Sequence, residues 1–96
     1  MEIKTTNYGV CKVKKHKYQT NGNLALSLID EEGQPVVYIT TNILPLAEDE
    51  FCANYYNMGA TLWNDIVTSG LFEMTGEKVP SGYCEYPVCK LVKELA

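Results

Sequence analysis

The stretch from residue 57 to residue 70, NMGATLWNDIVTSG, decides the fold expected for this chain. Asn57 suits a helix N-cap, and Gly70 suits the left-handed position just past a helix C-terminus. The apolar residues between them share one helical stripe, typical of an amphipathic helix: Leu62, Trp63, Ile66 and Val67. Because the rest of the chain has the pattern of strands, we expect this helix to cover one face of a sheet.

The composition indicates one folded domain over residues 1–96. Apolar residues make up 46% of the chain and charged residues 21%, which is the balance of a globular protein rather than a disordered one. No apolar run approaches the roughly 18 residues of a membrane span, and the N-terminus has no apolar signal segment. We therefore expect a cytoplasmic protein whose four cysteines are reduced thiols.

The net charge of −4 is unevenly distributed along the chain. The first twenty residues contain five lysines and one acid, whereas the remainder contains three lysines and eleven acids. No arginine is present, which counts against nucleic-acid recognition because the guanidinium group is the favoured reader of phosphates and bases.

The first 41 residues predict a three-stranded antiparallel meander. The strands are expected at residues 8–18, 24–29 and 34–41, joined by turns at Asn21-Gly22 and at residues 30–33. Four lysines make the second half of the first strand polar on both faces, which is typical of an edge.

The second half of the chain has weaker strand signals. Residues 47–56 are expected to be a connector with at most one short helical turn. After the helix we expect a short strand at 71–74, a turn at 75–78, a loop at 79–82 and a final strand at 83–92. Pro87 interrupts that last strand and, lacking an N–H group, should lie at an edge or a bulge.

Together these elements predict an α+β domain: a mostly antiparallel sheet of four to five strands, beginning with the three-stranded meander, with one α-helix packed across one face. The core is expected to contain Leu24, Leu26, Leu28, Val37, Ile39, Leu62, Trp63, Ile66, Val67 and Phe72.

No pattern of catalytic, cofactor-binding or metal-ligating residues stands out. The cysteines Cys11, Cys52, Cys84 and Cys89 include no Cys-x-x-Cys pair, so buried inert thiols are favoured over a zinc site or a disulfide. His16 is the only histidine and lies among lysines, which favours a solvated imidazole over a catalytic one. The sequence thus predicts a protein that is not an enzyme and that holds no metal or cofactor.

Three sets of surface residues are candidates for partner binding. Tyr55, Tyr56, Tyr83 and Tyr86 gather around the helix start and the last strand, and tyrosine is enriched at protein interfaces. Lys12, Lys14, Lys15 and Lys17 form a basic strand that could contact DNA or RNA. The acidic turns at 30–32 and 48–50 could instead imitate a DNA backbone.

Several turn residues give the chain a resemblance to a known family. Tyr18, the run Asn21-Gly22-Asn23-Leu24-Ala25-Leu26, Asn42, Ser81-Gly82 and Tyr86-Pro87 resemble a small family of domains of unknown function carried on conjugative transposons and plasmids of anaerobic gut bacteria. The likeness extends from about Val10 to Val92 and implies a cytoplasmic accessory protein of a mobile element, but no activity and no site residues.

These observations favour a non-enzymatic module that binds a protein partner through its tyrosine-rich end or an open sheet edge. No membrane partner is expected. The alternative is a nucleic-acid-linked role, either through the Lys12–Lys17 strand or through DNA mimicry by the acidic turns. The oligomeric state is left open by the sequence.

Overall fold

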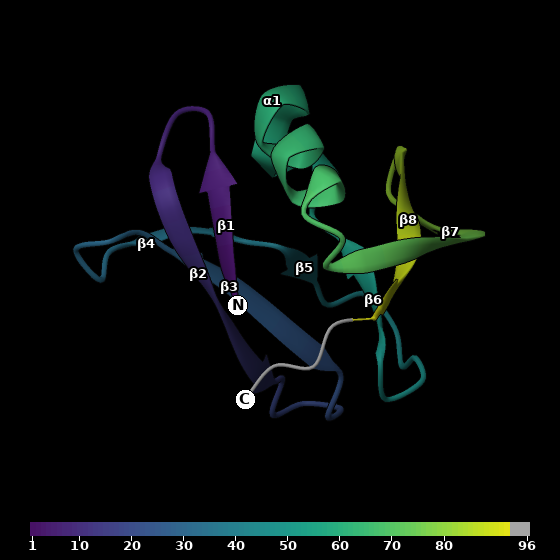
Figure 1. Cartoon of the computed structure of the whole chain (residues 1–96). Helices are drawn as coiled ribbons and strands as arrows, with labels where there is room; N and C mark the ends of the chain where they lie inside the picture. Colours follow the sequence, from purple (N-terminus) through teal and green to yellow (C-terminus); the bar gives the residue numbers. More distant parts are fainter. Residues whose placement is uncertain (93–96) are drawn as a thin grey trace.

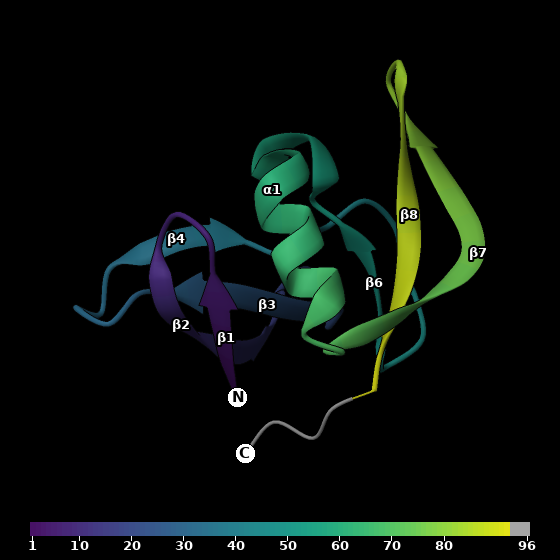
Figure 2. The ribbon, with the colours of Figure 1, turned by 45° about the horizontal axis from the view of Figure 1, so that its top comes forward.

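The computed structural model describes residues 1–92 and has the α+β architecture that the sequence predicts (Figures 1 and 2). In this part of the chain eight strands form two four-stranded antiparallel sheets, ordered β1-β2-β3-β4 (the N-terminal sheet) and β5-β6-β8-β7 (the C-terminal sheet). The strands are β1 (Glu2–Thr5), β2 (Gly9–Lys17), β3 (Leu24–Ile29), β4 (Pro35–Tyr38), β5 (Thr40–Thr41), β6 (Glu50–Ala53), β7 (Phe72–Ser81) and β8 (Cys84–Leu91), and the helix α1 is Tyr55–Thr68.

The N-terminal sheet is a meander, as predicted, with one strand more than expected. Strands β2 and β3 pair antiparallel from Lys12 opposite Ile29 to Lys17 opposite Leu24. The additional strand is β1, which pairs with the first half of β2. Its sequence signal is weak because Ile3 is its single large apolar residue, yet that side chain is 1% exposed. The second half of β2 therefore lies at an edge of the sheet, as its lysines predict.

The segment expected as a single third strand passes from one sheet to the other. Residues 35–38 pair with β3 in the N-terminal sheet, whereas residues 40–41 pair with β6 in the C-terminal sheet. Ile39 lies at the junction and is fully buried. Its N–H donates to the Leu26 carbonyl (2.8 Å) and its carbonyl accepts from the Asn54 N–H (2.9 Å). One residue thus connects the two sheets by backbone hydrogen bonds, an arrangement that forms a corner between packed sheets.

The C-terminal sheet differs from expectation in β6 and β7. The prediction of a connector at residues 47–56 is wrong, because β6 occupies Glu50–Ala53 with Phe51, Cys52 and Ala53 buried. The predicted turn and loop after Met74 are also wrong, since β7 continues to Ser81 across a register shift between Met74 and Lys78. A continuous apolar run and a bulged strand both lack the strict alternation that identifies strands.

Pro87 of β8 lies beyond the last residue paired with β6 and next to the register shift in β7, where it pairs with Lys78. Strand β6 ends opposite Val88, and β7 resumes its pairing at Lys78 after the register shift. A residue without an N–H group is tolerated there, as predicted.

The helix α1 is broken at Gly59, whose backbone (φ 79°, ψ 165°) is non-helical. The first turn, which precedes this break, begins after Asn54. The prediction of Asn57 as the N-cap is therefore wrong. Asn57 instead donates from its side-chain amide to Asn54 Oδ1 (2.8 Å). At the other end Gly70 has the expected left-handed conformation (φ 75°), and its N–H donates to the Val67 carbonyl.

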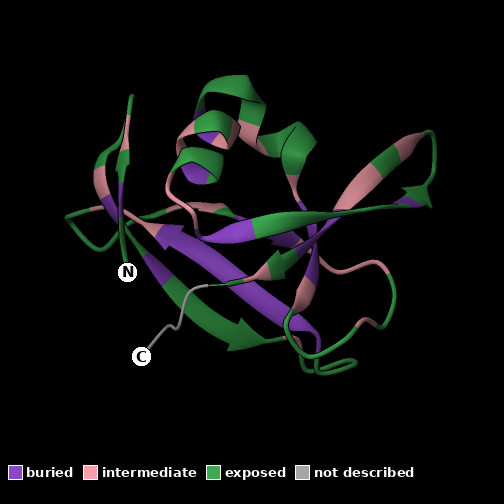
Figure 3. Ribbon diagram, turned by 45° about the vertical axis from the view of Figure 1, so that its right-hand side comes forward, coloured by how far each residue is buried: buried purple, intermediate pink, exposed green. Residues whose placement is uncertain are grey.

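The main core lies between the two sheets and beneath α1. Strand β3 is buried from Leu24 to Leu28, including its small residues Ala25 and Ser27 (Figure 3). Leu62 and Ile66 of α1 are buried in this core. Val67 is 42% exposed, so the prediction that it is buried is wrong. Trp63 and Val37 are half-buried and pack against the core. Buried residues outside the predicted core list include Ile3, Phe51, Leu71, Val79 and Val88. Cys11, Cys52 and Cys89 are buried, as predicted for inert thiols.

Candidate functional site

Six aromatic rings form a row that runs from the surface of β8 into the core. Neighbouring ring centroids are 5.3–5.6 Å apart, and four of the five pairs meet nearly at right angles. The order is Tyr86, Tyr56, Tyr55, Trp63, Phe72 and Phe51. Edge-to-face pairs stabilise each other by about 0.5–1.5 kcal/mol beyond their buried area. The exposed rings are therefore held in place by rings anchored in the core.

The break in α1 places the two exposed tyrosines in this row. Tyr55 and Tyr56 belong to the turn before Gly59, and the non-helical backbone at Gly59 separates that turn from the rest of α1. Tyr56 is also tied to the C-terminal sheet, because its hydroxyl donates to the Glu85 carbonyl of β8 (3.1 Å). The first turn of α1 is thus fixed against β8 rather than continuing the helix axis.

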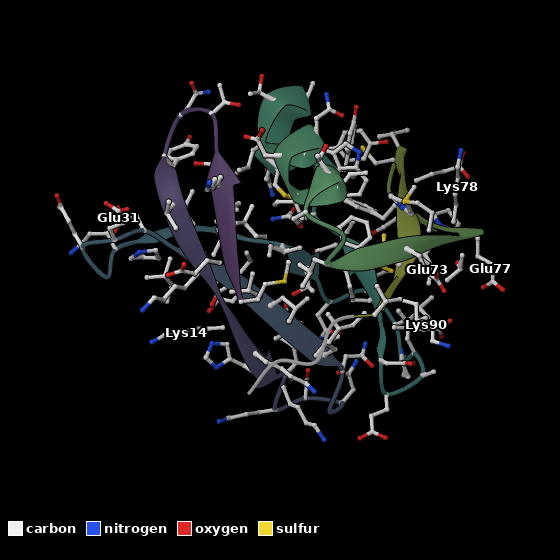
Figure 4. All side chains as sticks on the ribbon, in the orientation of Figure 1. Lys14, Glu31, Glu73, Glu77, Lys78 and Lys90 are labelled. Atoms are coloured by element: carbon white, nitrogen blue, oxygen red, sulfur yellow. The ribbon has the colours of Figure 1, made fainter. Side chains whose placement is uncertain are left out.

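A cleft of about 230 Å³ lies between this turn and the C-terminal sheet. Its walls are largely aromatic and apolar, and two oppositely charged residues line it as well. The lining residues are Tyr55, Tyr56, Trp63, Met74, Lys78, Glu85 and Pro87. Figure 4 shows Lys78 on the same side of β7 as α1. We call this feature the aromatic cleft.

Three of the four predicted interface tyrosines meet at the aromatic cleft. Tyr55 and Tyr56 line it, and Tyr86 packs edge to face on Tyr56. Tyr83 does not belong to the group, because it lies in the two-residue turn between β7 and β8 and is fully exposed. Sequence reasoning missed Trp63, Met74 and Pro87, which it assigned to the core or to strands. The sequence contained one signal, because Gly59 stands between Tyr55 and Trp63 and glycine can break a helix. The regular apolar stripe of residues 57–70 concealed it.

The four lysines of the predicted basic patch are all exposed, but they are divided between two faces of β2. Cys11 and Val13 point into the core, so strand alternation places Lys15 and Lys17 on that side and Lys12 and Lys14 on the outer side. No single face of the sheet therefore carries all four lysines.

The two acidic turns lie at opposite ends of the molecule (Figures 1 and 2). In the first turn Asp30 Oδ1 accepts hydrogen bonds from the backbone N–H groups of Glu32 and Gln34 (3.0 and 2.9 Å). In the second, Asp49 lies 3.8 Å from the Lys90 ammonium, and both side chains are half exposed. These carboxylates form no continuous acidic surface.

The cysteines are free thiols, and three of them are buried. Burial raises the pKa of Cys11 and of Cys52, and it raises the pKa of Cys89 to about 12 with a further contribution from the neighbouring Cys52. Thiols whose ionisation is so disfavoured are poor nucleophiles. Over residues 1–92 no group of three or more cysteine, histidine, aspartate or glutamate side chains is placed to hold a metal ion.

His16 is exposed on β2, and its Nε2 atom lies 3.4 Å from the Ser27 hydroxyl. No acid completes a triad with this pair among the hydrogen bonds of the described residues. Ser27 is 7% exposed and belongs to β3, an inner strand of the N-terminal sheet.

The asparagines Asn21, Asn23 and Asn42 form a structural hydrogen-bond network. Asn23 is 7% exposed, and its amide donates to Asn42 Oδ1 (2.9 Å) and to the Leu44 carbonyl (2.6 Å) while accepting from the Leu46 N–H (3.1 Å). Asn21 donates to the same Asn42 oxygen (3.2 Å). The network fastens the loop after β5 to the β2–β3 turn, which accounts for these residues without any role in binding.

Within residues 1–92 no helix has the length and apolar character needed to span a membrane. Comparison of the chain with models of protein families, with curated proteins and with solved structures finds no match.

Proposed function

We propose that this protein is a non-enzymatic binding module, and that its aromatic cleft receives an extended, proline-containing segment of a protein partner. The observation that carries this proposal is the row of edge-to-face rings that ends at the surface in Tyr55, Tyr56 and Tyr86. Tyrosine and tryptophan are the residues most enriched at the energetic centres of protein interfaces. Rings already fixed in place lose little conformational freedom when a partner binds.

The size of the cleft favours a partner segment over a cofactor or a drug-sized ligand. Its volume of about 230 Å³ lies below the roughly 300–1,000 Å³ typical of small-molecule sites. The space suits one or two side chains of a longer chain that continues over the surrounding surface.

The chemistry of the walls favours proline and aliphatic side chains. Tyr55, Tyr56 and Trp63 offer aromatic surface, and Met74, which is 54% exposed, adds an adaptable apolar contact. Proline-rich segments bind in aromatic-lined grooves because their extended helix is already formed and little entropy is lost. Lys78 and Glu85 line the same cleft and supply one group of each charge to orient the segment.

A cytoplasmic setting on a mobile element is part of the same proposal. The four free cysteines favour a reducing cytoplasm, and the resemblance carried by Asn21, Asn23 and Asn42 favours an accessory protein of a mobile element. An accessory protein without catalytic machinery acts by binding another component.

Selection of peptides from a random library on the immobilised protein tests the proposal. We expect the selected peptides to be rich in proline and aliphatic residues. Tyr56→Ala should weaken their binding by about tenfold or more, because a central interface tyrosine contributes about 1.4 kcal/mol or more. Tyr83→Ala and Tyr8→Ala remove exposed tyrosines outside the cleft and serve as matched controls.

Two results would contradict the proposal. One is an unchanged affinity in Tyr56→Ala when its circular dichroism shows a folded protein. The other is a loss of affinity in Tyr83→Ala equal to that in Tyr56→Ala, which would place the peptide at the β7–β8 turn.

A further inference from the structure

Met74 of β7 is the one methionine of the chain whose side chain lines the aromatic cleft. It is 54% exposed, whereas Met58 is half-buried against the main core and Met1, at the N-terminus, is 37% exposed. Oxidation converts a methionine thioether into a sulfoxide, which is polar and chiral at sulfur. Of the three methionines, Met74 is therefore the one whose oxidation would change the wall of a binding surface.

The sulfur of Met74 is held on one side by a buried thiol. Met74 lies opposite Cys89 in the β7–β8 register, and the Cys89 thiol donates to Met74 Sδ with a sulfur–sulfur distance of 3.7 Å. Cys89 is fully buried, and burial raises the pKa of its thiol to about 12, so the proton stays on Sγ at neutral pH. A thioether sulfur has two lone pairs, and this hydrogen bond occupies one of them. The other lone pair is left for a reagent that arrives from solvent.

Oxidation of this sulfur by hydrogen peroxide needs no further group of the protein. The free lone pair of Sδ attacks one peroxide oxygen, so that an S–O bond forms and the O–O bond breaks. The sulfur is oxidised by two electrons, and the leaving hydroxide takes the proton of the transferred oxygen and becomes water. Because the Cys89 thiol occupies the other lone pair, one of the two sulfoxide epimers should form in excess. The thiol itself stays protonated and is a poor nucleophile, so it is not consumed.

The sulfoxide changes the chemistry of the cleft wall. Met74 shares that wall with Tyr55, Tyr56 and Trp63, where its thioether offers an adaptable apolar contact. A sulfoxide oxygen at the same position brings a polar group to a contact that proline and aliphatic side chains cannot satisfy. Oxidation should therefore weaken the binding of an apolar segment without removing any side chain.

We propose that Met74 is a modification site at which hydrogen peroxide switches the aromatic cleft to a weaker binding state, with the Cys89 thiol directing the oxygen to one lone pair of the sulfur. The weaker binding rests on the function proposed above, whereas the oxidation and its epimer preference do not. The modification is reversible, because methionine sulfoxide reductases of two classes each reduce one epimer.

Mild treatment of the folded protein with hydrogen peroxide, followed by proteolysis and mass spectrometry, tests the oxidation step. We expect an added oxygen at Met74 before any at Met58, because Met74 is the more exposed. The resulting peptides are then incubated with each class of reductase, and one class should restore at least about threefold more Met74 than the other. The same protein oxidised in urea is the matched control, and there the two classes should restore equal amounts.

Three variants assign the effect to its residues. Cys89→Ala, shown to be folded by circular dichroism, should give the two epimers of Met74 sulfoxide in equal amounts, because the donor to Sδ is gone. Oxidation of the unaltered protein should weaken binding of the selected peptide by about fivefold or more. Met74→Leu keeps the size of the side chain but cannot take up oxygen, so its affinity should be the same before and after peroxide. Met58→Leu retains Met74 and should lose affinity on oxidation as the unaltered protein does.

Four results would overturn the proposal. They are oxidation of Met58 before Met74, equal epimers from the folded unaltered protein, an epimer excess that persists in Cys89→Ala, and an equal loss of peptide affinity on oxidation in Met74→Leu. A protein that binds no selected peptide even before oxidation would instead contradict the proposed function, and the mass and epimer measurements would still decide whether Met74 is the oxidation site.

Discussion

Asn23 is a buried polar residue whose side chain holds a loop in place. It is buried, and its amide bonds three groups of the loop at residues 42–46. Asn23→Ala removes these part-buried hydrogen bonds, which should lower the free energy of unfolding by about 1–3 kcal/mol.

Asn23→Asp distinguishes hydrogen bonding from simple packing at this position. A carboxylate cannot donate to Asn42 Oδ1 or to the Leu44 carbonyl, so this variant should be less stable than Asn23→Ala despite its closer shape. Urea unfolding measures both values. Equal stabilities of Asn23→Asp and the unaltered protein would show that the network contributes nothing.

Cys89 makes stability depend on pH at the alkaline end. In the folded chain burial raises the pKa of this thiol to about 12, whereas in the unfolded chain it ionises near the ordinary value of 9.0. The folded state therefore holds its proton more tightly. The contribution to stability is complete below about pH 9 and is lost as the pH rises from there towards 12.

Comparison with Cys89→Ala isolates this effect, because all other titrating groups are shared. We expect the variant to be less stable at about pH 7, where it leaves a cavity beside Met74, and to lose less stability between about pH 9 and 10.5. Urea unfolding in the presence of a reductant provides the measurement. Parallel pH profiles would contradict the assignment to Cys89.

For single residues, the sequence predicts which positions form turns better than it predicts which side chains bond each other. Asn21-Gly22 is a turn as predicted, and Gly22 has positive φ. The bonding of Asn23 to residues about twenty positions later has no local signature, so its burial was not predictable. Val67 was expected in the core because it lies at the margin of the apolar stripe, but only Leu62 and Ile66, which are one helical turn apart, are buried.

Among the elements, α1 has the conformation on which the aromatic cleft depends. Gly59 occupies a backbone region (φ 79°, ψ 165°) that is essentially restricted to glycine. Gly59→Ala should therefore lower the free energy of unfolding by about 1–3 kcal/mol or force the first turn to move. In either case affinity for the selected peptide should fall, because Tyr55 and Tyr56 precede the break.

Gly33→Ala is the control for this variant. Gly33 also has positive φ (82°), but it lies in the β3–β4 turn, outside the residues that line the cleft. It should lose stability to a similar extent and keep its peptide affinity. A full retention of affinity in Gly59→Ala would show that the break does not position the tyrosines.

Strand signals explain which elements were predictable. Strands β2 and β3 are bounded by clear turns and have strong strand patterns. Strand β1 has one large apolar residue, β6 has an unbroken buried run, and β7 changes register between Met74 and Lys78. A single apolar residue, an unbroken run and a shifted register each give no repeated alternation, so local pattern alone does not identify these strands.

For the whole molecule, the division into two sheets occurs at Ile39, where the chain leaves the N-terminal sheet and enters the C-terminal sheet. The sequence favoured one sheet of four to five strands, since nothing in the run from Pro35 to Thr41 marks a change of partner. The class and the single helix follow from local patterns, whereas the division into two sheets depends on pairings between distant segments.

Ile39→Ala should lower the free energy of unfolding by about 2–5 kcal/mol, as expected for a fully buried isoleucine. Because the two sheets share the core, unfolding should remain a single transition by far-ultraviolet circular dichroism and by Trp63 fluorescence. Tyr38→Ala, at the neighbouring exposed position, should change stability little. Separate transitions for the two probes would show that the sheets fold independently.

The most direct test of the aromatic cleft as a binding surface uses Trp63, the single tryptophan of the chain. The indole N–H resonance of Trp63 is followed by NMR while a selected proline-containing peptide is added. The proposal predicts a saturable shift of that resonance with the same dissociation constant as the peptide amides, and its loss in Tyr56→Ala. An indole resonance that stays in place while amides of the N-terminal sheet shift would contradict it.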